Sequence, residues 1–163
     1  MHWIRFAILL CVTAVLQAAL VDVVAIRDIE PNLMLILLVF FCIFGNSTEA
    51  IITSFTIGFG ADLVGPAMGP GMVSYGVLGT VMAYVNRVVA LSSKPGQGIA
   101  IFILGLGTGL LSDALTMAKS LPVEPDIWVQ NLATAGYSAV IGPFLLVPIG
   151  WCMGIRTDRA GAR

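Results

Sequence analysis

The chain has 163 residues, of which 58% are hydrophobic and only 10% are charged, and its mean hydropathy is +0.99. Soluble globular proteins carry about 25% charged residues, so this chain has too few charges to cover a water-facing surface. The formal net charge of −1 and the lack of any Lys/Arg cluster argue against a nucleic-acid partner. We therefore expect an all-α integral membrane protein that is surrounded by lipid.

Six apolar runs follow one another along the chain, and we expect each to be a transmembrane helix of one compact bundle. A helix rises about 1.5 Å per residue, so about 20 residues cross a hydrocarbon core of about 30 Å. The second and third runs are shorter than this, and we expect a tight hairpin that is partly shielded by its neighbours. The expected spans are residues 3–24, 31–44, 50–64, 72–89, 99–118 and 128–153, within a single transmembrane domain that covers 1–163.

The first run resembles a signal peptide, with Arg5 near its start and Ala18 and Ala19 near its end. Because further hydrophobic spans follow, we expect an uncleaved helix. Gln17 lies deep in this run and is expected to form an interhelical hydrogen bond. Pro31 then opens the second run, at the first turn of a helix, where a proline is tolerated.

The positive residues predict the orientation, because cytoplasmic loops of membrane proteins retain Lys and Arg. With six spans, both termini are expected in the cytoplasm and the loops around Arg27, Pro66 and Glu124 outside. The cytoplasmic side then holds Arg5, Arg87, Lys94, Arg156, Arg159 and Arg163, and the opposite side holds Arg27 and Lys119.

A carboxylate among glycines is the most informative feature of the sequence. Asp62 ends the third run, with Gly58 and Gly60 before it and Gly69 after it. An acid inside or at the edge of a membrane span is a functional-site candidate, because an unpaired charge is costly there. Glycines leave a helix surface flat, so that a neighbouring backbone can approach. We expect Asp62 either to bind free backbone N–H groups of the loop 65–71 or to meet a polar group on a partner.

The four-residue spacing of Gly58 and Asp62 is repeated by Gly109 and Asp113 in the fifth run. Each helix therefore offers a small residue and an acid on one face. One interpretation is a shared polar pocket or a polar docking seam. The other is that the glycines only permit close packing, while each acid reaches the membrane interface.

Catalytic constellations are mostly excluded by the residues that are missing. The sole histidine is His2, and Cys11, Cys42 and Cys152 lie far apart inside apolar runs, as buried small hydrophobic residues do. The stretch 58–62 resembles the Gly-x-Gly-Asp motif of intramembrane aspartyl proteases but is one residue too long, and the Tyr-Asp partner motif is absent. We expect no enzymatic activity, and we assign no catalytic, cofactor-binding or metal-binding residue.

A wider pattern runs from Glu30 to Tyr84. A Pro-Asn-Leu sequence opens the second run, Gly-x-Gly-x-Asp-Leu ends the third, and further glycines lead to an Ala-Tyr pair. With this pattern the chain resembles the MreD family of rod shape-determining proteins. The interval after Asp62 is one residue shorter than is usual in that family, so either Gly69 or Gly71 fills the family's glycine position. The residues that carry the resemblance are Pro31, Asn32, Leu33, Gly58, Gly60, Asp62, Leu63, Gly69, Gly79, Ala83 and Tyr84.

The resemblance implies a non-enzymatic subunit of the bacterial elongasome, which supports peptidoglycan synthesis and cell shape from the inner membrane. Such subunits bind the single-span protein MreC and, through it, act with RodA, a class B penicillin-binding transpeptidase and MreB. Their fold is similar to the substrate-binding components of energy-coupling-factor transporters. The candidate residues for packing, partner binding or a polar pocket are Pro31, Asn32, Gly58, Gly60, Asp62, Gly69, Gly79 and Asp113.

An alternative of a different class is the substrate-binding subunit of a vitamin-type energy-coupling-factor transporter. Ala14 and Ala18, which lie four residues apart on one face of the first run, and the outward acids also suit that function. A binder of this kind needs an outward cavity lined by polar and aromatic groups. The expected outer loops carry few aromatic residues, and Trp128 is more simply an interfacial anchor.

Overall fold

The computed structural model describes residues 3–24, 31–65, 68–89, 94–119 and 127–153. The described residues form six α-helices and no strand, so the all-α prediction is confirmed for these ranges. The loop residues Arg27, Pro66 and Glu124 and the basic tail from Arg156 lie outside the described residues. The helices are α1 (Trp3–Val24), α2 (Leu33–Phe44), α3 (Ser47–Val64), α4 (Pro70–Val89), α5 (Lys94–Ala118) and α6 (Ile127–Met153).

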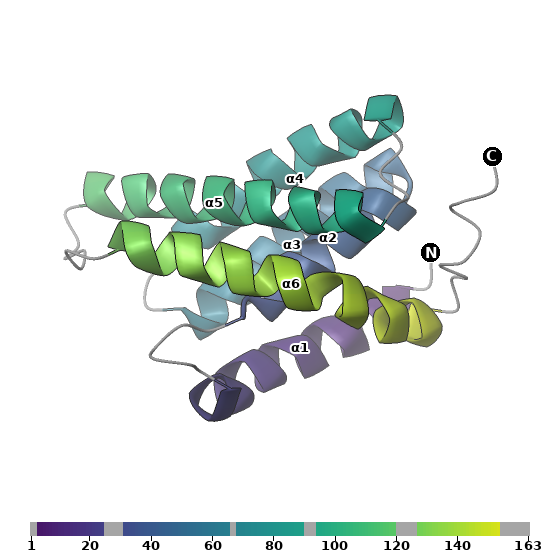
Figure 1. The fold of residues 1–163 in the computed structure, drawn as a ribbon, viewed down its shortest axis with the longest axis horizontal. Coiled ribbons are helices and arrows are strands. Elements are labelled where there is room, and N and C mark those ends of the chain that lie inside the picture. Colours follow the sequence, from purple (N-terminus) through teal and green to yellow (C-terminus); the bar gives the residue numbers. More distant parts are fainter. Residues whose placement is uncertain (1–2, 25–30, 66–67, 90–93, 120–126, 154–163) are drawn as a thin grey trace.

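The helices pack as one bundle in which α5 and α6 lie side by side and antiparallel (Figure 1). The start of α1 and the end of α6 lie at the same end of the bundle, which we call the proximal end. The start of α6 lies at the opposite, distal end. This arrangement returns the chain to the end at which α1 begins.

The short helix α2 forms the centre of the bundle. Residues 34–42 are all buried, and α2 contacts each of the other five helices. Those five form a ring around it, in the order α1, α3, α4, α5, α6 and back to α1. A helix that is apolar on all sides is stable only when it is buried. The second run is therefore shielded by its neighbours on every side.

The observed helices differ from the expected spans mainly at their N-terminal ends. The helix α2 is shorter than 31–44 because Pro31 and Asn32 precede it in non-helical conformation. The helix α3 begins at Ser47 rather than at residue 50, since the N–H of Asn46 donates to the Glu49 carboxylate at 3.3 Å and closes the first turn. The helices α4 and α5 likewise begin at residues 70 and 94 instead of 72 and 99.

Two helical segments of the described chain are long and apolar enough to cross a membrane by length and composition. They are Pro95–Ala118 and Ile127–Met153, while Trp3–Ala19 and Leu33–Phe44 are apolar but shorter. The criterion is thus met by two helices of the described residues and not by all six.

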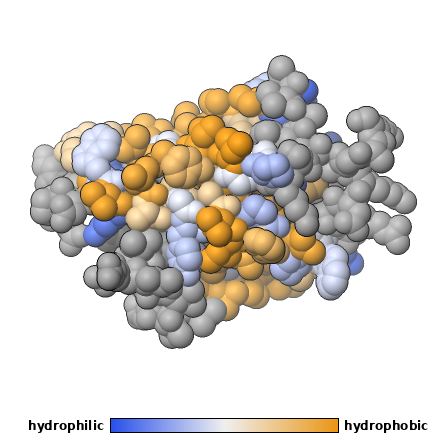
Figure 2. Space-filling view, viewed as in Figure 1, coloured by the Kyte–Doolittle hydropathy of each residue, from blue (hydrophilic) through white to orange (hydrophobic). Residues whose placement is uncertain are grey.

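Apolar side chains are prominent on the outer face of the ring, and Figure 2 shows them on one side of the molecule together with less apolar residues. Exposed apolar residues recur every three or four positions, so each set forms a stripe along its helix. Stripes of this kind are Ile4, Ile8, Val12 and Val15 on α1, Val73, Val77, Val81 and Val85 on α4, and Val140, Phe144 and Val147 on α6. The cysteines are free; Cys42 is buried as expected, but Cys11 and Cys152 face outward.

Candidate functional site

The carboxylate of Asp62, near the end of α3, binds the backbone at the start of α4. Its Oδ2 accepts hydrogen bonds from the N–H groups of Gly69 at 2.9 Å and Met72 at 2.8 Å, and its Oδ1 accepts one from Gly71 at 2.7 Å. Pro70 between them has no N–H. Asp62 thus satisfies every backbone donor of residues 69–72, which no preceding helical turn can reach. Two roles were expected for Asp62, and in the structure its carboxylate binds the N–H groups of the loop.

Two glycines bring the backbones of α3 and α4 into direct contact at this point. A Cβ atom added to Gly58 would lie 2.7 Å from the carbonyl oxygen of Gly71 and 2.8 Å from Cα of Met72. Both neighbours are backbone atoms, so the helices would have to separate to accept a side chain. At Gly60 the nearest atom is the end of the Leu10 side chain at 3.3 Å, which is a milder restriction. Gly58 therefore sets the spacing of α3 and α4, whereas Gly60 packs against α1.

The segment in front of α4 is also held from α5. Gly69 has a φ angle of +111°, a conformation that is open to glycine and strained for other residues. The Nζ atom of Lys119, just after α5, donates to the carbonyl oxygen of Met68 at 2.7 Å. The start of α4 is therefore fixed by Asp62 from one neighbouring helix and by Lys119 from the other.

The start of α2 is bound by side chains of other helices. The side chain of Asn32, the N-cap of α2, accepts from the N–H of Leu35 at 2.9 Å and donates to the hydroxyl of Tyr75 on α4 at 2.6 Å. The backbone N–H of Asn32 donates to Oγ of Ser138 on α6 at 2.9 Å. One residue thus connects α2 with both α4 and α6.

The first helix contributes Gln17 to the same place. Its Oε1 accepts from the N–H of Leu33 at 2.7 Å, and its Nε2 donates to the carbonyl oxygen of Pro31 at 3.3 Å. The expected interhelical bond of Gln17 is therefore made to the backbone of α2 and the residue before it. We call Gln17, Asn32, Tyr75 and Ser138 the cap cluster of α2.

The other end of α2 is satisfied by α4. The Nδ2 group of Asn86 donates to the carbonyl oxygens of Cys42 at 3.2 Å and Ile43 at 3.1 Å, which have no partner within their own helix. The thiol of Cys42 donates to the carbonyl oxygen of Gly79 at 3.4 Å. A Cβ atom at Gly79 would overlap Oγ of Ser54 on α3. Gly79 therefore lets α4 approach α2 and α3 together.

Asp113 lies at a different contact, between α5 and α6. Its Oδ2 accepts from the side-chain amide of Asn131, and a Cβ atom at Gly109 would lie 2.7 Å from Oδ1 of Asn131. Asp62 bonds to α4 and Asp113 bonds to α6, so the two acids have different partners. The repeated spacing therefore places a glycine and an acid at two separate helix contacts, and the two acids do not share one pocket.

The polar groups of the bundle are used in contacts between helices. No buried side-chain nitrogen or oxygen atom in the described part of the chain lacks a hydrogen-bond partner. Within the same ranges, no group of three or more His, Cys, Asp or Glu side chains is placed to hold a metal ion. These polar contacts fix the positions of the helices relative to one another.

Sequence reasoning found the Asp62 contact but missed most of its surroundings. Tyr75, Ser138, Asn86 and Lys119 were not singled out, although they complete the polar ties described above. The usable signal was an isolated polar residue in an apolar run, because such a group must find a partner when it is buried.

Comparison of the chain with models of protein families, with curated proteins and with solved structures gives no match. The assignment of a function therefore rests on the residues of the chain and their contacts.

Proposed function

We propose that this chain is a multi-pass protein of the bacterial inner membrane, in which the six helices form one bundle and both termini are cytoplasmic. The apolar outer face of the ring supports this placement, because large exposed apolar surfaces mark contact with a membrane or a partner. The inward position of the polar ties supports it as well, since backbone groups in lipid need partners within the protein. On this proposal the fold is similar to the substrate-binding components of energy-coupling-factor transporters.

The function that we propose is that of an MreD-type subunit of the elongasome. Such a subunit catalyses no reaction; it binds MreC and, through it, acts with RodA, a class B penicillin-binding transpeptidase and MreB. The observation that carries this proposal is the Asp62 contact, in which the most distinctive residues of the MreD-like pattern act together. Gly58 allows α4 to approach, and Asp62 binds the N–H groups of Gly69 and Gly71.

This contact suits a scaffold that presents a fixed surface to a partner helix. Association of helices in lipid depends on van der Waals packing between surfaces of matching shape. A bundle whose helices are tied by buried or half-buried hydrogen bonds keeps such a surface constant. The bonds of Asp62 and of the cap cluster are ties of this kind.

Co-purification in mild detergent tests the proposal. We expect MreC to be recovered with the native chain, and we expect Gly58→Leu and Asp62→Leu to reduce both MreC recovery and rod-shape complementation more than changes at Glu124 or Asp126. The control is Gly136→Leu, because a Cβ atom at Gly136 has no other atom within 4 Å. Each variant is compared at equal membrane abundance.

Two outcomes would contradict the proposal. Unchanged MreC recovery and cell shape with both Gly58→Leu and Asp62→Leu would show that this stretch serves packing alone. Recovery of an ATPase module and its coupling subunit in place of MreC would replace the proposal with the vitamin-transporter alternative.

A further inference from the structure

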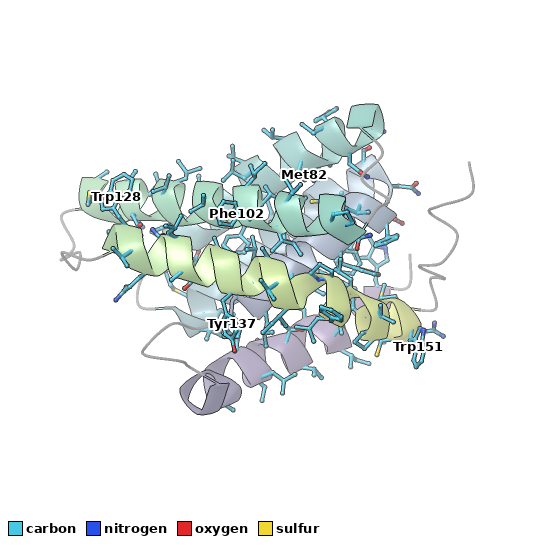
Figure 3. All side chains as sticks on the ribbon, in the orientation of Figure 1. Met82, Phe102, Trp128, Tyr137 and Trp151 are labelled. Atoms are coloured by element: carbon cyan, nitrogen blue, oxygen red, sulfur yellow. The ribbon has the colours of Figure 1, made fainter. Side chains whose placement is uncertain are left out.

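All three tryptophans of the chain are exposed and lie at helix ends. Trp3, the first residue of α1, is 48% exposed, and Trp128 and Trp151, near the start and end of α6, are 67% and 79% exposed. Figure 3 shows Trp128 and Trp151 at opposite ends of the bundle. Tryptophan rings gather at both membrane–water interfaces, because they combine an apolar body with a polar N–H group.

The spacing of these rings matches a bilayer. The continuous helix from Trp128 to Trp151 is about 35 Å long at about 1.5 Å per residue. A hydrocarbon core is about 30 Å thick, and the polar interfaces add to it on both sides. Two tryptophans at this separation therefore reach the two edges of the core when α6 is upright or moderately tilted.

The exposed charged residues, like the tryptophans, lie near the two ends of the bundle. Among the described side chains, the exposed charges are Arg5, Arg87 and Lys119, and each lies at or beside a helix end. At the proximal end the guanidinium carbon of Arg87 is 6.0 Å from the centre of the Tyr84 ring. Between the two levels the exposed large side chains of α6 are apolar, such as Val140 at 68% and Phe144 at 76%.

We propose that the bilayer is bounded by the level of Trp128 on the distal side and by the level of Trp3 and Trp151 on the proximal side, so that α2 begins near the middle of the bilayer. This inference rests on the proposed membrane location and is independent of MreC binding.

The position of α2 follows from its bond to α6. Asn32 donates to Ser138, which lies about 15 Å from Trp128 and about 20 Å from Trp151 along the helix. The helix α2 has 12 residues and is about 18 Å long, so it reaches from this depth to the proximal boundary. There its last carbonyl groups are bound by Asn86, next to Arg87. Two independent contacts therefore give the same placement.

This placement explains why the polar side chains of the cap cluster gather at the start of α2. Non-helical backbone at membrane depth is tolerated only where it is enclosed by protein or water, because lipid offers no hydrogen bonds. Pro31 is buried, and the N–H groups of Asn32, Leu33 and Leu35 are bound by Ser138, Gln17 and the Asn32 side chain. The ring thus supplies acceptors for these three N–H groups, so that a helix can start in the middle of the bilayer.

Quenching of tryptophan fluorescence by brominated lipids tests the two boundaries. The native chain is reconstituted into vesicles of phosphatidylcholine that carries bromine either near the headgroup or near the chain end. Since all three tryptophans lie at the boundaries, shallow bromine should quench the native protein more strongly than deep bromine. Variants that keep only Trp128 or only Trp151, with phenylalanine at the other two positions, should show the same order.

The matched control is Val140→Trp in a chain whose three native tryptophans are replaced by phenylalanine. Val140 is exposed and lies about 18 Å from Trp128 along α6, so its ring should be quenched more strongly by deep bromine. Equal depth for all probes, or deeper quenching of the native protein, would overturn the placement. If MreC is recovered but the tryptophans are not quenched in the expected order, this inference alone is overturned. If the quenching order is as expected but MreC is not recovered, the proposed function alone is overturned.

Discussion

At the residue scale, Asp62 shows why a carboxylate is found at the end of an apolar helix. The start of α4 presents three N–H groups that have no partner in their own helix, and at the proposed membrane location lipid could not supply one. Hydrogen bonds to an ionised acceptor are stronger than neutral ones, and the negative charge also lies at the positive end of the α4 dipole. One side chain therefore supplies all the acceptors for the three N–H groups at this helix end.

We expect replacement of Asp62 to destabilise the fold in a graded order. The Asp62→Asn substitution would keep one acceptor oxygen and place an NH₂ group against N–H donors, and the Asp62→Ala substitution would keep no acceptor. Each unpaired buried N–H costs about 1 to 3 kcal/mol. The midpoint of thermal unfolding in one detergent, followed by circular dichroism, should fall from the native chain to Asp62→Asn and further to Asp62→Ala.

The control for this series is Asp113→Asn. The new amide oxygen can still accept from Asn131, so the loss should be smaller than for Asp62→Asn. Equal midpoints for the native chain and Asp62→Ala would show that the three hydrogen bonds do not stabilise the bundle.

A second prediction at this scale compares two glycines. In Gly58→Ala the new methyl group meets the backbone of α4, and overpacking of this kind costs about 1 to 3 kcal/mol. In Gly136→Ala the methyl group enters open space, and alanine is favoured over glycine in a helix by up to about 1 kcal/mol. The unfolding midpoint should therefore fall for Gly58→Ala and stay constant or rise for Gly136→Ala. Equal shifts would contradict a backbone contact at Gly58.

The sequence was sufficient to identify Asp62, its glycines and the N–H groups of loop 65–71 as one of two expected partners, but not the partners of the cap cluster. An acid among glycines can be recognised from the sequence alone, because a carboxylate in an apolar run is costly in lipid. The partner of Asn32 is Tyr75, which is 43 residues away, and no spacing rule connects residues so distant in the chain. Long-range polar ties of this kind depend on how the helices are arranged around α2.

At the scale of single elements, α2 is the most unusual helix of the chain. It has 12 residues, which is too short to cross a bilayer alone, and its surface is buried on all sides. Phe6 of α1 contacts it through an edge-to-face pair with Phe41, whose ring centres are 5.0 Å apart. Its two ends are bound by side chains of α1, α4 and α6. Its stability therefore depends on its neighbours rather than on its own length.

A double-mutant cycle between Asn32 and Tyr75 tests this dependence. Asn32→Ala removes an N-cap, which costs about 0.5 to 2 kcal/mol, and Tyr75→Phe leaves the Asn32 amide without its acceptor. Because the residues are in contact, we expect a coupling energy of about 0.5 to 3 kcal/mol in unfolding measurements. The control is Tyr84→Phe, since that ring is 56% exposed while Tyr75 is 6% exposed. A coupling of zero would mean that the bond contributes nothing.

The sequence predicted the existence of all six helices better than their starts. Apolar runs identify the helices because burial and lipid contact both favour such runs. The first turns of α3 and α5 contain Ser47, Glu49, Lys94 and Gly96, which lie outside the expected spans 50–64 and 99–118. In the structure these polar residues extend the helices beyond the apolar part. The pattern of α2 has no polar face, so its central position could not be predicted from periodicity.

At the scale of the whole molecule, the ring around α2 explains how a small chain at the proposed membrane location can form a core. Apolar side chains are as well placed in lipid as in the protein interior, so hydrophobic burial alone does not drive helices together. Close glycine contacts such as Gly58 and Gly79, and polar ties such as Asn86 to α2, supply the missing specificity. The order of the helices in the ring results from these contacts, and the order along the chain does not reveal it.

The distribution of charges over the whole bundle predicts its orientation. Arg5 and Arg87 lie near the proximal end and Lys119 near the distal end, and cytoplasmic surfaces retain positive residues. We therefore expect the proximal end to face the cytoplasm. In a chain without native cysteines, single cysteines at positions 27, 66 and 124 should react with a membrane-impermeant maleimide in intact cells. A cysteine at position 94, at the start of α5, should react only after the membrane is permeabilised. External labelling at position 94, with no labelling at the other three positions, would contradict this orientation. The start of α5 would then lie outside the cell, and the whole bundle would have the opposite orientation.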